Sequence, residues 1–386
     1  MKKVVVSRLT KGAAYDIIKW NKHGMVYRAE GEVTQMAEIL TREGILALLS
    51  WYEKNKRELP WRKTKAPYRI WISEIMLQQT RVEAVKPYYF RFLEACPNVR
   101  ALAELPVDDL MKLWEGLGYY SRARNLQKAA REVVERYGGQ MPRSYEELRA
   151  LPGIGDYTAG AVASIAYDLR VPAVDGNVLR VLARVSGSRS DITQQRVKNQ
   201  YREALFRVIP EEAGDFTQSL IELGATVCVP NGPPKCQDCP LRGECVACGE
   251  GSQAELPVRA AKKARRVEKK TVLLIRDGER TALRKRPDKG LLAGLFELPN
   301  TEGHLSLEEL PAHIRALGLE PLHLERLEDA KHIFSHIEWH MVAYSVRIAP
   351  EFDGWHAASG MLLVPNEELH ERYAIPSAFS AYVKYL

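Results

Sequence analysis

The chain has 386 residues, of which 46% are hydrophobic and 27% charged, and these values exclude a mainly disordered, collagen-like or coiled-coil protein. A single core rarely grows past about 250–300 residues, so two or three domains are expected. Lys and Arg number 56 against 49 Asp and Glu, which gives a net charge of +7. This modest surplus is compatible with an anionic partner but does not establish one.

The N-terminus and the apolar stretches bear on the location of the protein. Lys2 and Lys3 are followed by only three apolar residues, Val4–Val6, which is too short for the apolar core of a secretory signal. No apolar stretch approaches the ~18 residues that a membrane-spanning helix needs. We therefore expect a cytoplasmic protein without a membrane partner, in which the six Cys do not form a disulfide framework.

The first half of the chain contains an extension and a helical region. Residues 1–35 show no sustained period and are interpreted as an N-terminal extension, with Met36 as an alternative start. Residues 36–227 carry apolar residues at helical spacing, as in the run 67–75, and short Gly and Pro breaks separate these runs. We see no convincing strand in this region and expect it to be all-α.

After residue 227 the texture of the sequence changes twice. Residues 228–248 form a Cys-rich loop, and residues 249–270 form a linker in which the stretch 258–270 holds seven basic residues and one acid. This run is either a solvated linker or a segment that crosses close to phosphates. Residues 271–386 are expected to form a mixed α/β domain, with strands at 271–275, 281–283, 295–298 and 340–348 and helices near 306–317 and 366–373.

Four closely spaced Cys carry the clearest metal signal. Seven, two and five residues separate them, and four Pro are interleaved. Four thiolates on a stiff loop could hold a tetrahedral metal or a four-iron four-sulfur cluster. Because a zinc ribbon usually has two short Cys pairs set well apart, and only one of these pairs is short, the pattern favours one 4Fe-4S cluster over zinc or no metal. The expected ligands are Cys228, Cys236, Cys239 and Cys245, with Cys96 and Cys248 as bystanders.

The segment Leu151-Pro-Gly-Ile-Gly155 predicts a tight hairpin between two helices. Gly153 and Gly155 permit positive φ and leave backbone N–H groups uncovered at the start of the next helix. Such N–H groups can bind a DNA phosphate without sequence preference. The alternative is an ordinary helix–helix turn.

Two carboxylates are candidates for chemistry. Glu74 lies among Trp, Ile, Met and Leu, where an apolar setting would raise its pKa and keep it protonated. The alternative is a helical Glu that faces solvent. Asp175, in the run Asp-Gly-Asn-Val, precedes a helix and taken alone could be a plain N-cap.

Taken together and in this order, the motifs resemble the helix-hairpin-helix DNA glycosylases that carry an iron–sulfur cluster, and within them the MutY-type adenine DNA glycosylases. The similarity runs from about Met36 to the C-terminus. One departure is the seven residues between the first two Cys, where the family usually has six. The matching segments are PWR at 60–62, SEIMLQQT at 73–80, GLGYYSRARNL at 116–126, LPGIG at 151–155, DGNV at 175–178, the Cys cluster and KGLLAGLFELP at 289–299.

The resemblance implies an all-α helix-hairpin-helix glycosylase region with an iron–sulfur loop, followed by an α/β Nudix-like domain. It also implies a monomer that acts on double-stranded DNA containing adenine opposite 8-oxoguanine or guanine and hydrolyses the N-glycosidic bond of that adenine. In the catalytic pocket, Glu74 would protonate the adenine and Asp175 would stay ionised to stabilise the sugar cation, with Tyr157 and Asn177 lining the pocket. The DNA contacts would come from Arg62, Leu77, Gln79, Thr80, Tyr119, Gly153 and Gly155, and 8-oxoguanine would be read by Phe334, Ser335 and His336.

Several alternatives stay open. An endonuclease III-like pyrimidine glycosylase and lyase is disfavoured because Tyr157 occupies the place of the Schiff-base Lys of those relatives, and a phenol cannot form an imine. A nucleotide pyrophosphatase is disfavoured because Pro311 interrupts the place of the Glu-rich box of active Nudix enzymes. For Leu77 and Tyr119 the alternative is core packing, and a non-catalytic DNA-binding protein is the last possibility.

Overall fold

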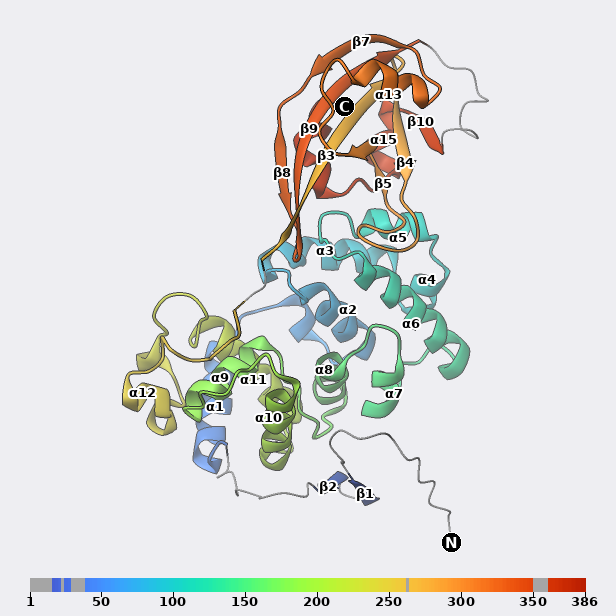
Figure 1. The fold of residues 1–386 in the computed structure, drawn as a ribbon. Helices are drawn as coiled ribbons and strands as arrows, with labels where there is room; N and C mark the ends of the chain where they lie inside the picture. Colours follow the sequence, from blue (N-terminus) through green and yellow to red (C-terminus); the bar gives the residue numbers. More distant parts are fainter. Residues whose placement is uncertain (1–15, 22–23, 29–38, 262–263, 350–359) are drawn as a thin grey trace.

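A helical region and a sheet domain make up most of the computed structural model, which describes residues 16–21, 24–28, 39–261, 264–349 and 360–386 (Figure 1). Within 39–261 the chain forms only α-helices and 3-10 turns, which confirms the prediction of an all-α region. The α-helices are α1 Arg42–Asn55, α2 Pro67–Leu77, α3 Val82–Ala95, α4 Val99–Glu104, α5 Val107–Leu113, α6 Ser121–Tyr137, α7 Tyr145–Ala150, α8 Asp156–Tyr167, α9 Gly176–Val185, α10 Gln195–Val208, α11 Ala213–Thr226 and α12 Val246–Glu250.

The helical region contains two separate hydrophobic cores. One is built by α2 to α8, and the other by α1, α9, α10 and α11. The chain leaves the first core after Ala173 and enters the second at Val178. Figure 1 shows the two groups of helices side by side beneath the sheet domain. Residues 174–177 therefore lie at the boundary between the cores.

Helix α2, which carries the candidate acid Glu74, is buried along most of its length. Pro67 occupies its first turn, where the missing N–H costs nothing. Residues on every side of α2 are buried, including Ile70, Trp71 and Ile75, as expected of a helix that is apolar all round. Glu74 is the one acidic residue in this helix. It is buried because the apolar residues around it pack into the core.

The C-terminal domain is a mixed sheet with the strand order β10-β4-β3-β9-β7, in which β3 and β9 pair in parallel and the other pairs are antiparallel. Alternate residues of β3 face opposite sides: Val272 and Leu274 join one core, Leu273 and Ile275 the other. Helices cover both faces, α13 on one and α15 and α16 on the other. The strands are β3 Arg266–Arg276, β4 Arg280–Lys285, β5 Phe296–Glu297, β6 Asn300–Glu302, β7 Pro321–Arg326, β8 Ala330–Ile333, β9 Ile337–Ile348 and β10 Met361–Pro365, and the helices are α13 Leu310–Ala316, α15 Asn366–Arg372 and α16 Ser380–Val383.

Some elements differ from the sequence-based expectation. Strand β3 begins at Arg266, inside the predicted linker, where its first residues pair with Ile337–Met341 of β9. The sequence did not predict this part of the strand because these residues are mostly exposed and basic. Strands β7 and β8 were not expected, since most of their side chains are partly or fully exposed and give no apolar pattern. In the predicted N-terminal extension the described residues form a two-stranded hairpin, β1 Asp16–Asn21 and β2 Gly24–Arg28. The other residues of 1–35 lie outside the described part.

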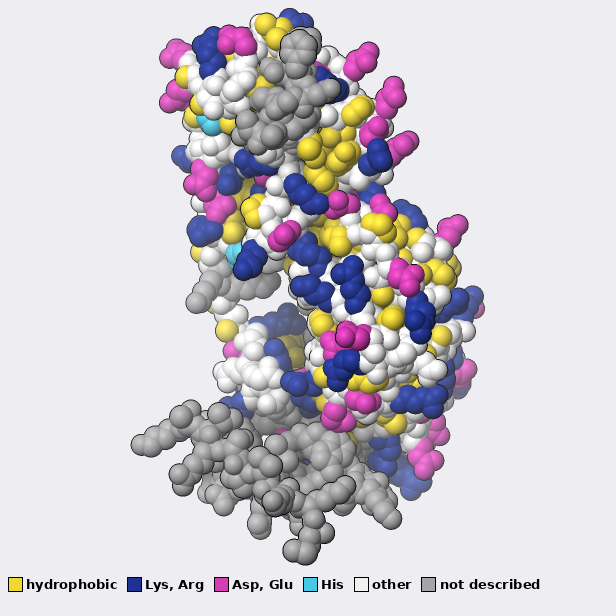
Figure 2. Space-filling view, turned by 90° about the vertical axis from the view of Figure 1, so that its right-hand side faces the viewer, with side chains coloured by type: hydrophobic (Ala, Val, Ile, Leu, Met, Phe, Trp, Pro, Cys, Tyr) yellow, Lys and Arg dark blue, Asp and Glu magenta, His cyan; other side chains and the backbone are white. Residues whose placement is uncertain are grey.

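The sheet domain contacts the helical region through α5 and α6. Leu295 and Ala374 pack in the first helical core, the Ile375 N–H donates to Glu115 Oε1 at 2.9 Å, and Lys285 pairs with Asp108 at 2.9 Å. Figure 2 shows one face of this junction, where Lys and Arg side chains gather among fewer acidic ones. None of the helices in the described ranges combines the length and hydropathy that a bilayer crossing requires.

Candidate active site

Glu74 lies at the centre of the candidate site. Its side chain projects from α2, is 7% exposed, and accepts a hydrogen bond from the Tyr157 hydroxyl at 2.7 Å through Oε2. Burial raises the pKa of Glu74 to about 7, the Tyr157 bond opposes this rise, and the nearby charge of Asp175 adds to it. A substantial fraction of Glu74 is therefore protonated at neutral pH, as general acid catalysis requires.

Asp175 lies at the N-terminus of α9, at the boundary of the two cores. Its Oδ1 accepts from the Val178 N–H at 2.8 Å, so it is indeed an N-cap, and its Oδ2 accepts from Asn177 Nδ2 at 2.8 Å. Burial raises the pKa of Asp175, while these two hydrogen bonds stabilise the ionised form. One helix of each core thus contributes a carboxyl group, and Tyr157 and Asn177 each bind one of the two.

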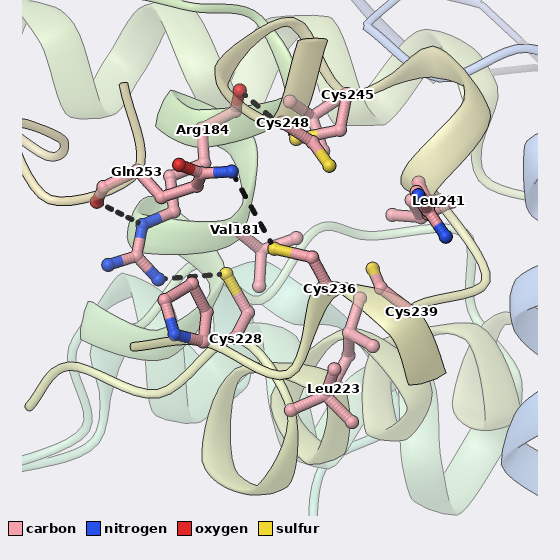
Figure 3. Close-up of a pocket in the computed structure, with 14 residues that line it drawn as sticks. Val181, Arg184, Leu223, Cys228, Cys236, Cys239, Leu241, Cys245, Cys248 and Gln253 are labelled. Atoms are coloured by element: carbon pink, nitrogen blue, oxygen red, sulfur yellow. Dashed lines mark hydrogen bonds between the residues drawn. The ribbon is translucent and has the colours of Figure 1, made fainter. Parts of the chain in front are cut away.

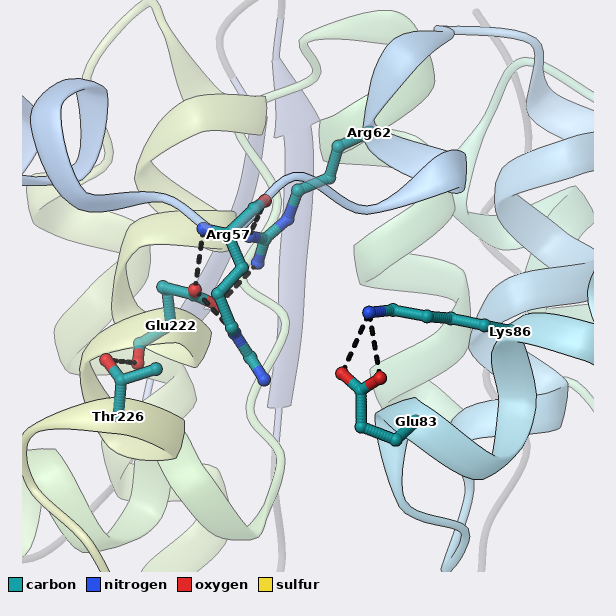
Figure 4. A network of polar contacts seen from close by, with 6 residues as sticks. All are labelled: Arg57, Arg62, Glu83, Lys86, Glu222 and Thr226. Atoms are coloured by element: carbon teal, nitrogen blue, oxygen red, sulfur yellow. Dashed lines mark hydrogen bonds and ion pairs between the residues drawn. The ribbon is translucent and has the colours of Figure 1, made fainter.

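Arg62 does not lie free for DNA. Its Nη2 donates to Glu222 at 2.7 Å, its Nη1 donates to the Arg57 carbonyl, and its side chain is 11% exposed (Figure 4). Burial would raise the pKa of Glu222, but hydrogen bonds from Arg57 and Arg62 hold it at about 2. The same arginine is close enough to Glu74 to lower the pKa of that residue. The structure therefore places Arg62 near the Glu74 carboxyl, engaged in an internal ion pair, and gives no support for a direct DNA contact.

The predicted hairpin at 151–155 joins α7 to α8. Gly153 has φ +76°, and a Cβ there would meet the Cβ of Asn125 at 2.6 Å, so this position requires glycine. Gly155 has φ −90° and open space around it, so only Gly153 uses the positive φ that both glycines permit. No side chain caps the N-terminus of α8, and both glycines are exposed. The first N–H groups of α8 are consequently open to an anion.

Two turns carry Gln79 and Tyr119, which the resemblance makes candidate wedge residues, that is, side chains inserted into the DNA stack. Gln79 and Tyr119 are both exposed and both adopt the left-handed conformation, with φ +59° and +47°. Non-glycine residues in this region cost on the order of 1 kcal/mol each and persist where their surroundings fix them. Leu77 and Thr80 are half-buried beside them, and Leu77 packs against the first core.

Arg122 fixes these two turns and was missed in the sequence, although it lies inside the segment GLGYYSRARNL. Its Nη1 donates to the carbonyls of Ile75, Met76 and Gln78, and its Nη2 donates to those of Leu117 and Gly118. Burial lowers its pKa to about 10, so it stays charged at neutral pH. One buried guanidinium therefore ties the end of α2 to the turn that carries Tyr119.

The segment 334–336 is the tight turn between β8 and β9. The Phe334 ring is half-buried and packs edge-on against Trp339 at 4.9 Å between ring centroids. Ser335 and His336 are exposed, and Ser335 Oγ lies 3.0 Å from the Tyr119 hydroxyl. The turn is thus in contact with the candidate wedge across more than 200 residues of sequence.

Two protein-family models match this chain, one in each of its two regions. The model of the HhH-GPD superfamily base excision DNA repair proteins matches residues 72–206, and that of the NUDIX domain matches residues 271–385. A solved thermostable thymine-DNA glycosylase shares 29% identity with a TM-score of 0.48, over 53% of this chain and 95% of that one. The adenine DNA glycosylase of Mus musculus is 38% identical over 78% of this chain and 70% of its own length. Those of Homo sapiens and of Buchnera aphidicola subsp. Schizaphis graminum are 35% and 33% identical, over 87% and 78% of this chain and 72% and 87% of their own lengths.

This chain belongs to the adenine DNA glycosylase family. The two family models cover the acid in α2 and the C-terminal Nudix-like sheet, so the fold agrees with the resemblance found in the sequence.

Membership in this family also suggests an iron–sulfur cluster, and the Cys-rich loop fits one. The side chains of Cys228, Cys236, Cys239 and Cys245 line a single pocket together with apolar residues of α9 and α11 (Figure 3). Arg184 Nη1 donates to Cys228 Sγ at 3.2 Å, as suits a ligand thiolate. Four half-buried thiols with a charged N–H donor match the donor set that such clusters require.

Two further residues of this adenine DNA glycosylase family member were not identified as functional from the sequence. Glu222 lies in the apolar run LIELGA before Cys228, the same signal that singled out Glu74, and its side chain is fully buried. Cys248, predicted to be a bystander, also lines the cluster pocket and makes a second short pair with Cys245.

Proposed function

We propose that this chain hydrolyses the N-glycosidic bond of adenine mispaired with 8-oxoguanine or guanine in duplex DNA, without strand cleavage. The observation that carries the proposal is the pair of buried carboxyl groups, Glu74 and Asp175, held by Tyr157 and Asn177 within one family fold. Glycosidic bonds are commonly broken by such pairs, one protonated and one ionised.

The two carboxyl groups take different tasks in this reaction. Glu74 donates its proton to a ring nitrogen of adenine, which lets the base leave as a neutral molecule. The C1′–N bond breaks and the sugar becomes oxocarbenium-like, and ionised Asp175 stabilises that positive charge. Water then adds its oxygen to C1′, and the carboxylate of Glu74 takes up the released proton. Tyr157 orients Glu74 through the 2.7 Å bond, and Asn177 orients Asp175.

An adenine inside the stack is out of reach of Glu74, so its nucleotide must be flipped out of the duplex. Unstacking costs a few kcal/mol, and inserted side chains help to offset it. Gln79 and Tyr119, exposed at the tips of their turns and backed by Leu77 and Thr80, suit this wedge role. The open N–H groups at Gly153 and Gly155 suit a phosphate of the same strand.

Recognition of the opposite base is proposed for Phe334, Ser335 and His336. The lesion differs from guanine mainly by one oxygen and by a ring N–H that replaces an acceptor. The Ser335 hydroxyl or a His336 ring nitrogen could sense that change, since both are exposed. Phe334 packs against Trp339 and would hold the turn in place.

We propose Cys228, Cys236, Cys239 and Cys245 as ligands of one 4Fe-4S cluster, which would organise the loop carrying Lys235 and Arg242. The spacing of the four Cys supports this over zinc, because only one of their pairs is short, whereas a zinc ribbon usually has two short pairs set well apart. A monomeric state and a cytoplasmic location are proposed as well.

A single-turnover assay on four duplexes tests the function. Adenine placed opposite 8-oxoguanine, guanine, cytosine or thymine should be released fast from the first two and slowly from the others, with the strand left uncut. A fifth duplex that carries a damaged pyrimidine tests the endonuclease III-like alternative, which release of that base together with cleavage of the strand would favour. No release from any duplex would mean a non-catalytic DNA-binding protein.

A further inference from the structure

The cluster pocket contains a fifth thiol. Cys248 lies in the short helix α12, three residues after Cys245, and lines the same pocket as the four proposed ligands. Figure 3 shows its side chain beside Cys245, on the side of the pocket that faces Cys236. Cys236 and Cys248 both line this pocket. With it the sequence contains two short pairs, Cys236–Cys239 and Cys245–Cys248.

Helix α12 holds Cys248 firmly. Ala247 is fully buried, and Val246 packs so closely on the end of α9 that a Cβ at Gly187 would meet its Cγ1 at 2.5 Å. The Cys248 N–H donates to the Cys245 carbonyl at 3.1 Å. Because Ala247, directly before it, is buried and its own N–H is bonded, the backbone of Cys248 is held beside the pocket.

Cys236 has a weaker attachment. It follows the exposed segment Asn231–Pro233, in the loop that is one residue longer than the family pattern, and Gly232 there has φ +74°. Few packing contacts fix such a loop, so Cys236 can withdraw at small cost. Iron accepts any Cys thiolate that reaches it, so the neighbouring thiol is chemically equivalent.

We propose that Cys248 is a reserve cluster ligand, which binds iron in place of Cys236 when Cys236 is absent or displaced. This inference rests on the proposed cluster. In the exchange an Fe–S bond to Cys236 breaks and one to Cys248 forms, Cys236 takes up the proton that Cys248 gives up, and no electron is transferred.

Alanine variants of the full-length chain, purified without oxygen, test the exchange through iron content and visible absorbance. Alanine is used because a serine oxygen could itself bind iron. Cys236→Ala should retain iron near the wild-type content with a shifted spectrum. The double variant Cys236→Ala with Cys248→Ala should lose iron. Cys239→Ala is the matched control from the same pair, and it should lose iron because the proposal provides no replacement for Cys239.

Alkylation with iodoacetamide provides a second readout for the fraction that retains iron. Cys248 should be modified in the iron-loaded wild type, protected in iron-loaded Cys236→Ala, and modified again after chelation, with buried Cys96 as the unreactive reference. Loss of iron from Cys236→Ala equal to that from Cys239→Ala would overturn the inference, as would retention of iron by the double variant. A wild-type protein without iron would instead overturn the proposed cluster itself.

Discussion

The catalytic site and the 334–336 turn are built in opposite ways. Glu74 is buried between helices, and its partners come from α8 and from the start of α9. Ser335 and His336 are exposed at the tip of a two-strand turn, where Phe334 packs against Trp339. Chemistry that depends on a perturbed carboxyl group requires burial, whereas reading a base in a duplex requires groups at the surface. Substitutions in the two regions should therefore produce different failures.

The largest effect is expected at the buried acid. Glu74→Gln keeps the shape of the side chain and removes its proton, so base removal should fall roughly 10²- to 10⁴-fold, the usual range for loss of a general acid. Affinity for the mispaired duplex should stay near the wild-type value, measured by fluorescence anisotropy. Near-normal release of adenine by this variant would show that another group supplies the proton.

The exposed turn should affect preference rather than chemistry. A lost hydrogen bond costs ~0.5–1.5 kcal/mol, so loss of two costs ~1–3 kcal/mol, or roughly 5- to 150-fold. Phe334→Ala combined with Ser335→Ala and His336→Ala should lower rate and affinity for adenine opposite 8-oxoguanine by about that factor and change those for adenine opposite guanine much less. Equal losses on both duplexes would mean that the turn only holds the domain in place, and no loss would exclude it from recognition.

The pH dependence separates the regions further. Because burial raises the pKa of Glu74 to about 7, the single-turnover rate should fall about tenfold per pH unit above that value as the proton is lost. The Tyr157 bond lowers this pKa, so Tyr157→Phe should move the falling limb to higher pH. The triple variant of the turn should leave the limb in place. A limb that does not move in Tyr157→Phe would contradict the assignment of this limb to Glu74.

The smallest effect concerns the contact that joins the two regions. Tyr119→Phe keeps the ring and removes the hydroxyl that lies 3.0 Å from Ser335. Its coupling with Ser335→Ala, measured as a double-mutant cycle on the stability of the free protein, should be about 0.5–1.5 kcal/mol. Strictly additive effects would show that this hydrogen bond contributes no net stability.

Much of the fold could be predicted because burial leaves a periodic trace. The run that became α2 is mostly apolar, and the one acid in it identified Glu74. Strands β7 and β8 show no apolar alternation, because most of their side chains are partly or fully exposed and need not be hydrophobic. The first residues of β3 were not predicted for the same reason, since they are mostly exposed and belong to a run rich in basic residues.

Site residues that have a local sequence signal of their own were predicted. Contacts between residues distant in sequence were missed. Asp175 could be identified from its position directly before a predicted helix. The ion pair between Arg62 and Glu222 could not, because it joins positions 160 residues apart. Arg122 binds carbonyl groups of another segment, and a carbonyl group leaves no sign in the sequence. Cys248 was set aside because spacing alone cannot tell which thiols turn toward one pocket.

One measurement tests most directly whether chemistry and recognition are separate. The ratio of single-turnover rates for adenine opposite 8-oxoguanine and opposite guanine is determined for the wild type, for Glu74→Gln and for the triple variant of the turn. Glu74→Gln should lower both rates equally and leave the ratio unchanged, while the triple variant should lower the ratio with little change on the guanine duplex. A changed ratio in Glu74→Gln, or an unchanged ratio in the triple variant, would contradict the division of labour between the two domains.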